Sequence, residues 1–436
     1  MLRRLERPSR NPVTMRSTLL AAALAAPLAL AASAVAATQE TTPAADSFDG
    51  LRAEFDQLSR YLMSRRGIGT AERQELLALR RQLDAYAAAN PDDARPTVLD
   101  LQISLWLGED DRVDAAFATI LDRSPDNTAI RRRWAQARGQ ANRWDAALEV
   151  LSDPSLAGMP EAMLDQARML MNLNRFAEAL AVLEQLPTDG EGAATVASQA
   201  TALKLQLETL AEAWAVEEAL LAAEAEKNDL PRVSLDTGKG VIVLELFEDQ
   251  APYTVANFIE LVESDFYDGT KFHRVLPGFM AQGGDPNTIA GASGAPGQGG
   301  PGYTIPDESS RSDKRKHFAG RLAMAKPSDP ERPGKAKPNS AGSQFYITVV
   351  PTSHLDEEYT VFGRVIEGDD IARSLRMDDL LRSATVLRKR DSEYKPVKLG
   401  QTTPASTAAT EDDASNASSQ GETAGDSASG ESASGG

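Results

Sequence analysis

The amino-acid sequence predicts a multidomain protein in which an all-α repeat domain precedes a closed antiparallel β-barrel. Three observations lead to this prediction. Residues 48–228 have helical periodicity throughout, and a short pattern recurs within them. After residue 231 the sequence changes to short β-branched runs separated by glycine-rich loops. A chain of 436 residues is also too long for one compact core, which favours at least two domains.

The first domain is expected to span residues 47–228. Ala, Leu, Glu and Arg dominate this region and β-branched residues are few, which favours helix. Prolines such as Pro91, Pro125 and Pro187 fall between the periodic segments, where helix breakers are expected.

A six-residue pattern recurs inside the helical domain: Arg, an apolar residue, two acidic or small residues, Ala and an apolar residue. Its copies begin at Arg112, Arg143 and Arg175, so they are 31 and 32 residues apart. A helix–turn–helix unit of this length resembles the tetratricopeptide repeat (TPR), whose copies stack into a curved solenoid with a concave face. We expect this face to recruit a client or a protein partner. The alternative is a helical spacer or dimerisation domain.

The second domain is expected to span residues 231–390. Residues 233–247 form two apolar runs around a glycine-containing turn, which indicates a β-hairpin. Pro252 begins a helix with apolar residues at helical spacing on one face, and a second helix is expected near residues 369–375. Many short strands with only two helices predict a closed barrel.

Residues 272–285, with the sequence FHRVLPGFMAQGGD, are similar to the signature segment of the cyclophilin family of peptidyl-prolyl cis-trans isomerases. Residues 322–325, 339–347 and 361–365 continue the resemblance in the family's order. The resemblance implies a bacterial, exported isomerase that acts on proline-containing polypeptides. It also implies an eight-stranded barrel with two capping helices.

The resemblance further implies the residues of the active site. Arg274 would be the catalytic residue, and Gln282 beside it would hold the substrate backbone and support the guanidinium group. The substrate proline would lie in an apolar pocket next to a groove. The expected substrate-binding residues are Phe279, Met280, Tyr346 and Leu355 in the pocket, Gln344 and the backbone of Ala325 and Lys326 in the groove, and His354 and Tyr359 beside the pocket.

These residue types suit isomerisation of an X–Pro bond. Twisting the bond removes amide resonance against a barrier of roughly 20 kcal/mol. The prolyl nitrogen then becomes pyramidal and can accept a hydrogen bond, so a fixed guanidinium group favours the twisted state over both planar isomers. No nucleophile, metal or cofactor is needed, and we expect none in this chain of three histidines and no cysteine. The alternative is a non-catalytic chaperone or scaffold that binds proline segments.

Two features depart from the family pattern. His354 stands where cyclosporin-sensitive members often carry Trp, so cyclosporin sensitivity does not follow from the resemblance. Residues 326–338 are longer and more charged than the usual connection at this place. Because this segment borders the expected groove, we expect it to change which residues are preferred before the proline.

The N-terminal segment predicts export. Several arginines precede an apolar run at residues 19–32, and small residues follow at 34–36, which is the order of a secretory signal peptide at residues 1–37. Met1 and Met15 both remain as starts. We expect a periplasmic protein without stable membrane insertion after cleavage. An uncleaved membrane anchor that faces the periplasm is the alternative.

The remaining features bear on partners and metals. The net charge of −18 argues against a nucleic-acid partner, because phosphate binding requires a basic face. Residues 401–436 are rich in Ser, Ala, Gly and acidic residues and contain no Lys, Arg or aromatic residue, so we expect a disordered acidic tail. The three histidines lack the spacing of metal ligands, and we expect no metal site.

Overall fold

The computed structural model describes residues 47–64, 68–187 and 193–400. The predicted signal peptide, both candidate start sites and the predicted acidic tail lie outside these residues. Within them, no helix combines the length and the apolar character needed to cross a membrane.

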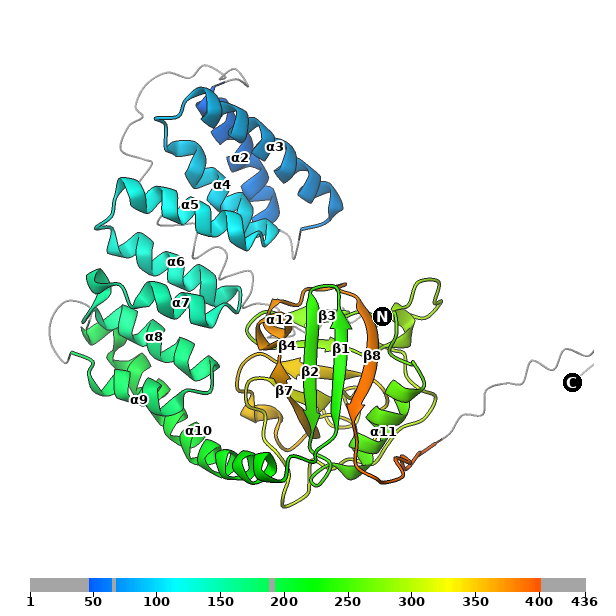
Figure 1. Cartoon of the computed structure of the whole chain (residues 1–436). Helices are drawn as coiled ribbons and strands as arrows, with labels where there is room; N and C mark the ends of the chain where they lie inside the picture. Colours follow the sequence, from blue (N-terminus) through cyan, green and yellow to red (C-terminus); the bar gives the residue numbers. More distant parts are fainter. Residues whose placement is uncertain (1–46, 65–67, 188–192, 401–436) are drawn as a thin grey trace, which may run out of the picture. The chain divides into compact units, whose positions relative to one another are not determined.

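The first half of the described chain is helical, which confirms this part of the prediction (Figure 1). Pro91, Pro125 and Pro187 lie between helices, as expected. The α-helices are α2 (Phe48–Met63), α3 (Thr70–Ala89), α4 (Arg95–Leu107), α5 (Asp110–Arg123), α6 (Thr128–Gln140), α7 (Trp144–Leu151), α8 (Pro160–Asn172), α9 (Phe176–Glu184) and α10 (Ala193–Lys227), with a 3-10 turn, η2, at Pro154–Leu156.

The recurring six-residue pattern marks the start of alternate helices. Its three copies begin at or beside the first residues of α5, α7 and α9, and each of these helices packs on the helix before it. The fifth residue of each copy is a buried alanine, at Ala116, Ala147 and Ala179. A small residue at this position lets the paired helices approach closely. The likeness of these pairs to TPRs stays a prediction.

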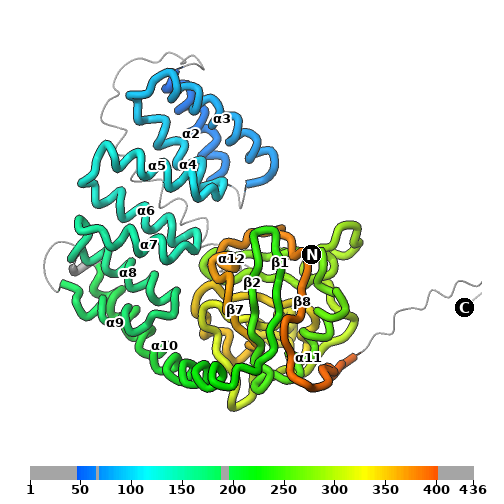
Figure 2. The backbone as a smooth tube through the Cα atoms, in the orientation of Figure 1, coloured from blue at the N-terminus to red at the C-terminus, as the bar shows by residue number. Residues whose placement is uncertain are grey.

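The second half contains one antiparallel sheet and two α-helices, α11 (Pro252–Glu263) and α12 (Asp369–Ser374). The order of the strands in the sheet is β3-β4-β6-β5-β7-β2-β1-β8, and β2, β1 and β8 lie side by side in the backbone trace (Figure 2). The strands are β1 (Arg232–Thr237), β2 (Gly240–Leu246), β3 (Arg274–Leu276), β4 (Met280–Gly283), β5 (Arg321–Met324), β6 (Phe345–Thr348), β7 (Val361–Glu367) and β8 (Leu381–Arg388).

The sheet curls into a half-barrel that is not closed, so the prediction of a closed barrel is wrong. Between the edge strands β3 and β8, the described residues form a single β-bridge, from Lys271 to Leu380. The amide of Asp378 donates to the carbonyl of Phe272 at this corner, and Asp378 has a φ of 70°. A residue with a left-handed backbone conformation turns the chain there. The two chain segments therefore meet just before β3 and β8 begin and do not continue as a ladder.

The core of this half lies between the sheet and helix α11. Val255, Phe258, Ile259 and Val262 are at most 2% exposed, which confirms the predicted apolar face of this helix. The Phe258 ring packs edge-to-face on Phe345, with 5.6 Å between the ring centroids. This core fixes the strands on which the candidate site is built.

One face of helix α10 packs against the β half. Trp214, Glu217, Leu221 and Glu224 are spaced by three or four residues, so they share one side of the helix. The Trp214 ring meets Phe318 edge-on, with 4.7 Å between the centroids. Leu221 packs on an apolar cluster that contains residues of β4, β5, β6 and β7.

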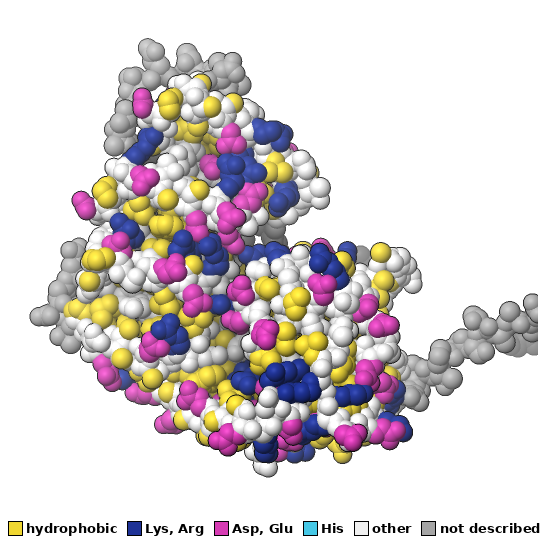
Figure 3. Space-filling model, viewed as in Figure 1, with side chains coloured by type: hydrophobic (Ala, Val, Ile, Leu, Met, Phe, Trp, Pro, Cys, Tyr) yellow, Lys and Arg dark blue, Asp and Glu magenta, His cyan; other side chains and the backbone are white. Residues whose placement is uncertain are grey.

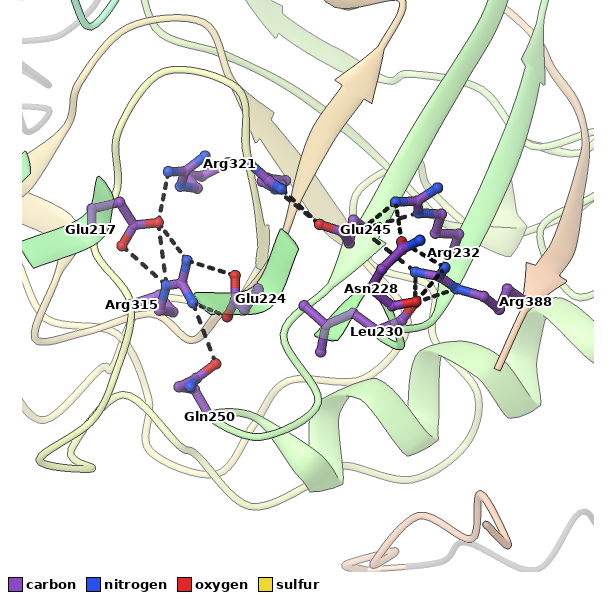
Figure 4. Close-up of polar contacts among 11 residues, drawn as sticks. Glu217, Glu224, Asn228, Leu230, Arg232, Glu245, Gln250, Arg315, Arg321 and Arg388 are labelled. Atoms are coloured by element: carbon purple, nitrogen blue, oxygen red, sulfur yellow. Dashed lines mark hydrogen bonds and ion pairs between the residues drawn. The ribbon is translucent and has the colours of Figure 1, made fainter. Parts of the chain in front are cut away.

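Two arginines of the β half complete a buried ionic cluster on this face of α10 (Figure 4). Arg315 bonds to both Glu217 and Glu224, and Arg321 Nη2 lies 2.8 Å from Glu217 Oε1. The guanidinium carbon of Arg315 also lies 3.8 Å from the centroid of the Phe247 ring. Buried charges require such partners. Elsewhere, on the face in Figure 3, basic and acidic side chains are interspersed.

Candidate active site

Arg274 is placed by the hairpin of β3 and β4. It is the first residue of β3 and lies directly opposite Gln282 of β4. Side chains of opposite residues lie on the same face of a sheet, so these two are neighbours. Among the described residues, the Arg274 guanidinium makes a single polar contact, from Nη1 to Met280 Sδ at 3.8 Å. Burial lowers the pKa of Arg274, and Tyr359 opposes this shift.

A chain of amide hydrogen bonds orients Gln282. Its Nε2 donates to Gln344 Oε1 at 2.9 Å, and Gln344 Nε2 donates to the carbonyl of Gly299 at 2.9 Å. The Gln344 carbonyl accepts from the Ala325 amide, also at 2.9 Å. Gln344 therefore links the Arg274 hairpin to the start of the segment after β5.

The residues predicted to hold the proline belong to one apolar cluster. Met280 and Tyr346 are only 2% and 4% exposed and form its base. Phe279, Leu355 and Tyr359 are half-buried and pack against them. A proline ring entering here would meet the partly exposed side chains first and the buried pair below them.

His354 and Tyr359 frame the cluster with ring contacts. The His354 ring stacks on Phe279 with 5.9 Å between centroids and an interplanar angle of 20°. The Tyr359 ring meets Tyr346 edge-on at 5.9 Å. His354 thus supplies a flat, smaller ring where the family resemblance suggested a Trp.

The side chain of Lys326 is buried and forms an ion pair. Its Nζ lies 2.8 Å from Asp307 Oδ2, and its side chain is only 3% exposed. The same Nζ lies 5.6 Å from the centroid of the Tyr359 ring. The charge at this position is therefore neutralised at the edge of the site.

The segment 326–338 is an ordered loop. Ser328 and Ala336 form a β-bridge, and the Ala336 amide donates to Glu358 Oε2 at 3.1 Å. Lys335 pairs with the same Glu358 carboxylate at 2.7 Å. Because Glu358 precedes Tyr359, the charged insert is anchored beside the predicted pocket.

A buried polar chain below the pocket was missed by the sequence analysis. Tyr346 Oη lies 2.9 Å from His317 Nε2, and His317 Nδ1 lies 2.8 Å from Asp356 Oδ1. The carboxylate accepts from Nδ1–H, which leaves Nε2 as the acceptor for the Tyr346 hydroxyl. Burial lowers the pKa of His317, so the neutral ring is favoured, and burial raises the pKa of Tyr346. No spacing signal in the sequence connects these three residues.

All eleven predicted site residues come together through these contacts. Arg274 contacts Met280, and Gln282 is linked to Ala325 through Gln344. His354 stacks on Phe279, and Lys326 lies over the Tyr359 ring. The pocket cluster connects the others. In the described part of the chain, no group of three or more His, Asp or Glu side chains could hold a metal ion. The arrangement offers a guanidinium group beside an apolar pocket.

Comparison with known proteins places this site in a family. The family model described as "Cyclophilin type peptidyl-prolyl cis-trans isomerase/CLD" matches residues 232–399. A peptidyl-prolyl cis-trans isomerase of Synechococcus elongatus is 43% identical over 155 residues, which are 35% of this chain and 94% of the relative. Peptidyl-prolyl cis-trans isomerase B of Bacillus subtilis is 41% identical over 33% of this chain and 90% of its own.

Similar proteins also occur in mouse and in Cryptosporidium parvum. The mouse peptidyl-prolyl cis-trans isomerase-like 1 is 46% identical over 32% of this chain and 75% of its own. A solved cyclophilin-type isomerase from Cryptosporidium parvum covers 37% of this chain and 99% of its own, at 28% identity and a TM-score of 0.31. The matches to the Synechococcus and Bacillus proteins cover at least 90% of those relatives and fall on the half that contains Arg274. The chain therefore belongs to the cyclophilin-type peptidyl-prolyl cis-trans isomerases, EC 5.2.1.8.

Proposed function

We propose that residues 231–390 accelerate isomerisation of X–Pro bonds, with Arg274 as the catalytic residue. The observation that carries this proposal is the unpaired guanidinium group of Arg274 beside the apolar cluster of Met280 and Tyr346. Its one described polar contact is a weak one to sulfur, so its N–H groups remain available to a substrate. Donation to the prolyl nitrogen stabilises the twisted amide more than either planar isomer.

The other site residues bind and orient the substrate in this proposal. Gln282 is held by Gln344, so its carbonyl can support the Arg274 guanidinium or accept from the substrate backbone. Phe279 and Leu355 enclose the proline ring above Met280 and Tyr346. Burial of the ring in this pocket gives affinity and fixes one side of the bond that rotates.

The helical half recruits clients in this proposal, as a TPR-like solenoid of residues 47–228. The paired helices with buried alanines at the repeated position support the repeat assignment. Together with the N-terminal sequence, they suggest an exported isomerase that assists folding of periplasmic proteins. The mature N-terminus in a periplasmic fraction would test the export and the cleavage near residue 37.

An isomerase assay on the full chain tests the catalytic proposal. The Arg274→Ala variant should lose about 100-fold or more in kcat/KM on a proline peptide, the usual loss on removing a donor to the transition state. Arg382→Ala is the matched control, because Arg382 is exposed on β8 and, among the residues that the structure describes, pairs with Asp236 alone. Equal activity of Arg274→Ala and the wild type would reject the mechanism. Peptide binding without turnover in the wild type would favour the non-catalytic scaffold.

A further inference from the structure

An open groove lies where the helical half meets the turn between β3 and β4. Its volume is 760 Å³. Residues of the helical half, from α4 to α8, form one wall, and Pro277, Gly278 and Arg376 form the other. None of the residues that line the groove makes the amide or ring contacts described for the proline site. The groove is therefore a separate site from the one proposed for catalysis.

The groove and the proline pocket are linked by the turn between β3 and β4. Gly278 lines the groove, and Phe279, the next residue, packs in the pocket cluster and stacks on His354. The Gly278 amide donates to Asn142 Oδ1 at 2.8 Å, which fixes the turn to the helical wall. An extended polypeptide advances about 3.3 Å per residue. A chain with its proline beside Phe279 can therefore enter the groove within a few residues.

The groove is basic although the protein is acidic. Its lining contains five arginines but only two carboxylates, Asp110 and Asp114, in a chain with a net charge of −18. Asp114 is shared by Arg138 Nε at 2.9 Å and Arg143 Nη2 at 2.8 Å, so one carboxylate faces two guanidinium groups. The lining arginines are Arg133, Arg138, Arg143, Arg168 and Arg376.

Other details of the wall fit a bound polypeptide. Burial lowers the pKa of Arg133, and the nearby charge of Arg132 adds to this shift. Ser104 and Trp144 also line the groove, and in the described part of the chain Ser104 Oγ and Trp144 Nε1 are buried without a hydrogen-bond partner. Unsatisfied polar groups of this kind are costly, and a peptide backbone offers them both donors and acceptors.

We propose that this groove binds an extended acidic segment of the same polypeptide whose proline occupies the pocket. The inference rests on the proposed isomerase function, because the groove and the pocket would act on one client chain. Because Gly278 of the groove directly precedes Phe279 of the pocket, the bound segment lies close to the proline in the client sequence. The excess of arginine in the lining favours Asp and Glu side chains over neutral or basic ones.

Three peptides test the groove on the full-length chain by protease-free NMR exchange measurements. They are a short proline peptide, the same peptide with an acidic extension, and an isosteric version whose extension carries Asn and Gln. In the wild type, the acidic extension should raise kcat/KM roughly tenfold over the neutral extension at low salt, and high salt should remove the gain. The measured quantity is the acidic-to-neutral ratio within each variant.

The double variant Arg133→Gln, Arg168→Gln should bring this ratio close to one. Arg81→Gln removes one positive charge from an exposed position on α3 outside the groove and should keep the wild-type ratio. Unchanged circular dichroism and melting would show that the double variant is folded. A ratio that survives in the double variant would overturn the assignment.

The remaining outcomes separate this inference from the proposed function. If the short peptide is turned over but the wild-type ratio is one, the groove does not bind the client and the isomerase function stands. If even the short peptide is not turned over, the isomerase function fails first. An acidic preference that emerges only after removal of residues 401–436 would assign the groove to the chain's own tail and overturn the assignment to the client.

Discussion

Arg315 forms a buried ion pair with Glu217. Arg315 Nη2 lies 2.7 Å from Glu217 Oε1, and the two side chains are 0% and 4% exposed (Figure 4). Glu217 also pairs with Arg321, so one carboxylate of α10 serves two arginines of the isomerase domain. Burial lowers the pKa of Arg321 to about 10, which shows how much its charged form depends on such partners.

Replacement of Glu217 by Ala should therefore destabilise the protein strongly. The substitution leaves two buried guanidinium groups with less negative charge, and the loss of one partner of a buried pair typically costs about 3–5 kcal/mol of unfolding free energy. Chemical denaturation of the full chain measures this loss. Glu218→Ala is the matched control, because Glu218 is the next residue and is exposed. Similar unfolding free energies for the two variants would contradict the expected role of the cluster.

Tyr346 and Tyr359 should respond in opposite ways to loss of their hydroxyl groups. Tyr346→Phe keeps the ring below the proline but leaves the buried His317 Nε2 without its donor. We expect a loss of about 1–3 kcal/mol in unfolding free energy with a modest change in activity. Tyr359 lies at the edge of the pocket. The Tyr359→Phe variant should therefore have a lower kcat/KM and nearly unchanged stability. Denaturation and isomerase assays on both variants distinguish the two roles.

His317 should make stability depend on pH below neutrality. Burial is the main cause that lowers its pKa from the ordinary 6.5, His354 and Arg321 add to this shift, and Asp356 opposes it. Between the lowered pKa and 6.5, the unfolded state binds more protons than the folded state. Stability should therefore be fully present above 6.5 and fall as the pH decreases below that value.

The measurement for His317 is the unfolding free energy at several pH values from neutral to mildly acidic. One such group contributes a slope of at most about 1.4 kcal/mol per pH unit. Because burial also lowers the pKa of His273, the slope of His317→Gln should be smaller than that of the wild type but not zero. Equal slopes would show that the His317 ring is not kept neutral by the fold.

Much of the isomerase domain was predictable because its motifs are local. The segment around Arg274 and Gln282 forms one hairpin, and the apolar face of α11 follows from its helical spacing. Sequence patterns of this kind report which residues share a strand or a helix face. Whether the edge strands β3 and β8 meet depends on a turn at Asp378, which no periodicity reveals.

Contacts between distant segments were not predictable. His317 and Tyr346 are 29 residues apart and meet only because neighbouring strands bring them together. Glu217 looks like any surface glutamate of a long helix, yet it is buried against Arg315, which lies 98 residues later in the sequence. A charged residue is expected to be exposed unless a partner is known, and one sequence does not name that partner.

Asn142 and Asn174 of the helical half accept hydrogen bonds from backbone amides of the isomerase domain. They occupy equivalent positions, directly before the second and third copies of the repeated pattern, with φ values of 62° and 59°. Asn142 Oδ1 accepts from the Gly278 amide, and Asn174 Oδ1 accepts from the Ala319 amide at 3.0 Å. Each substitution to Gly removes these bonds while keeping a residue that tolerates positive φ.

Hydrogen exchange reads out each contact separately. In Asn142→Gly, the Gly278 amide should exchange roughly tenfold faster, in keeping with the loss of about 1–1.5 kcal/mol from one hydrogen bond, while Ala319 keeps its protection. Asn174→Gly should give the reverse result, so each variant is the control for the other. Faster exchange at both amides in either variant would mean that the two turns release together. No change at either amide would show that these asparagines do not hold the isomerase domain.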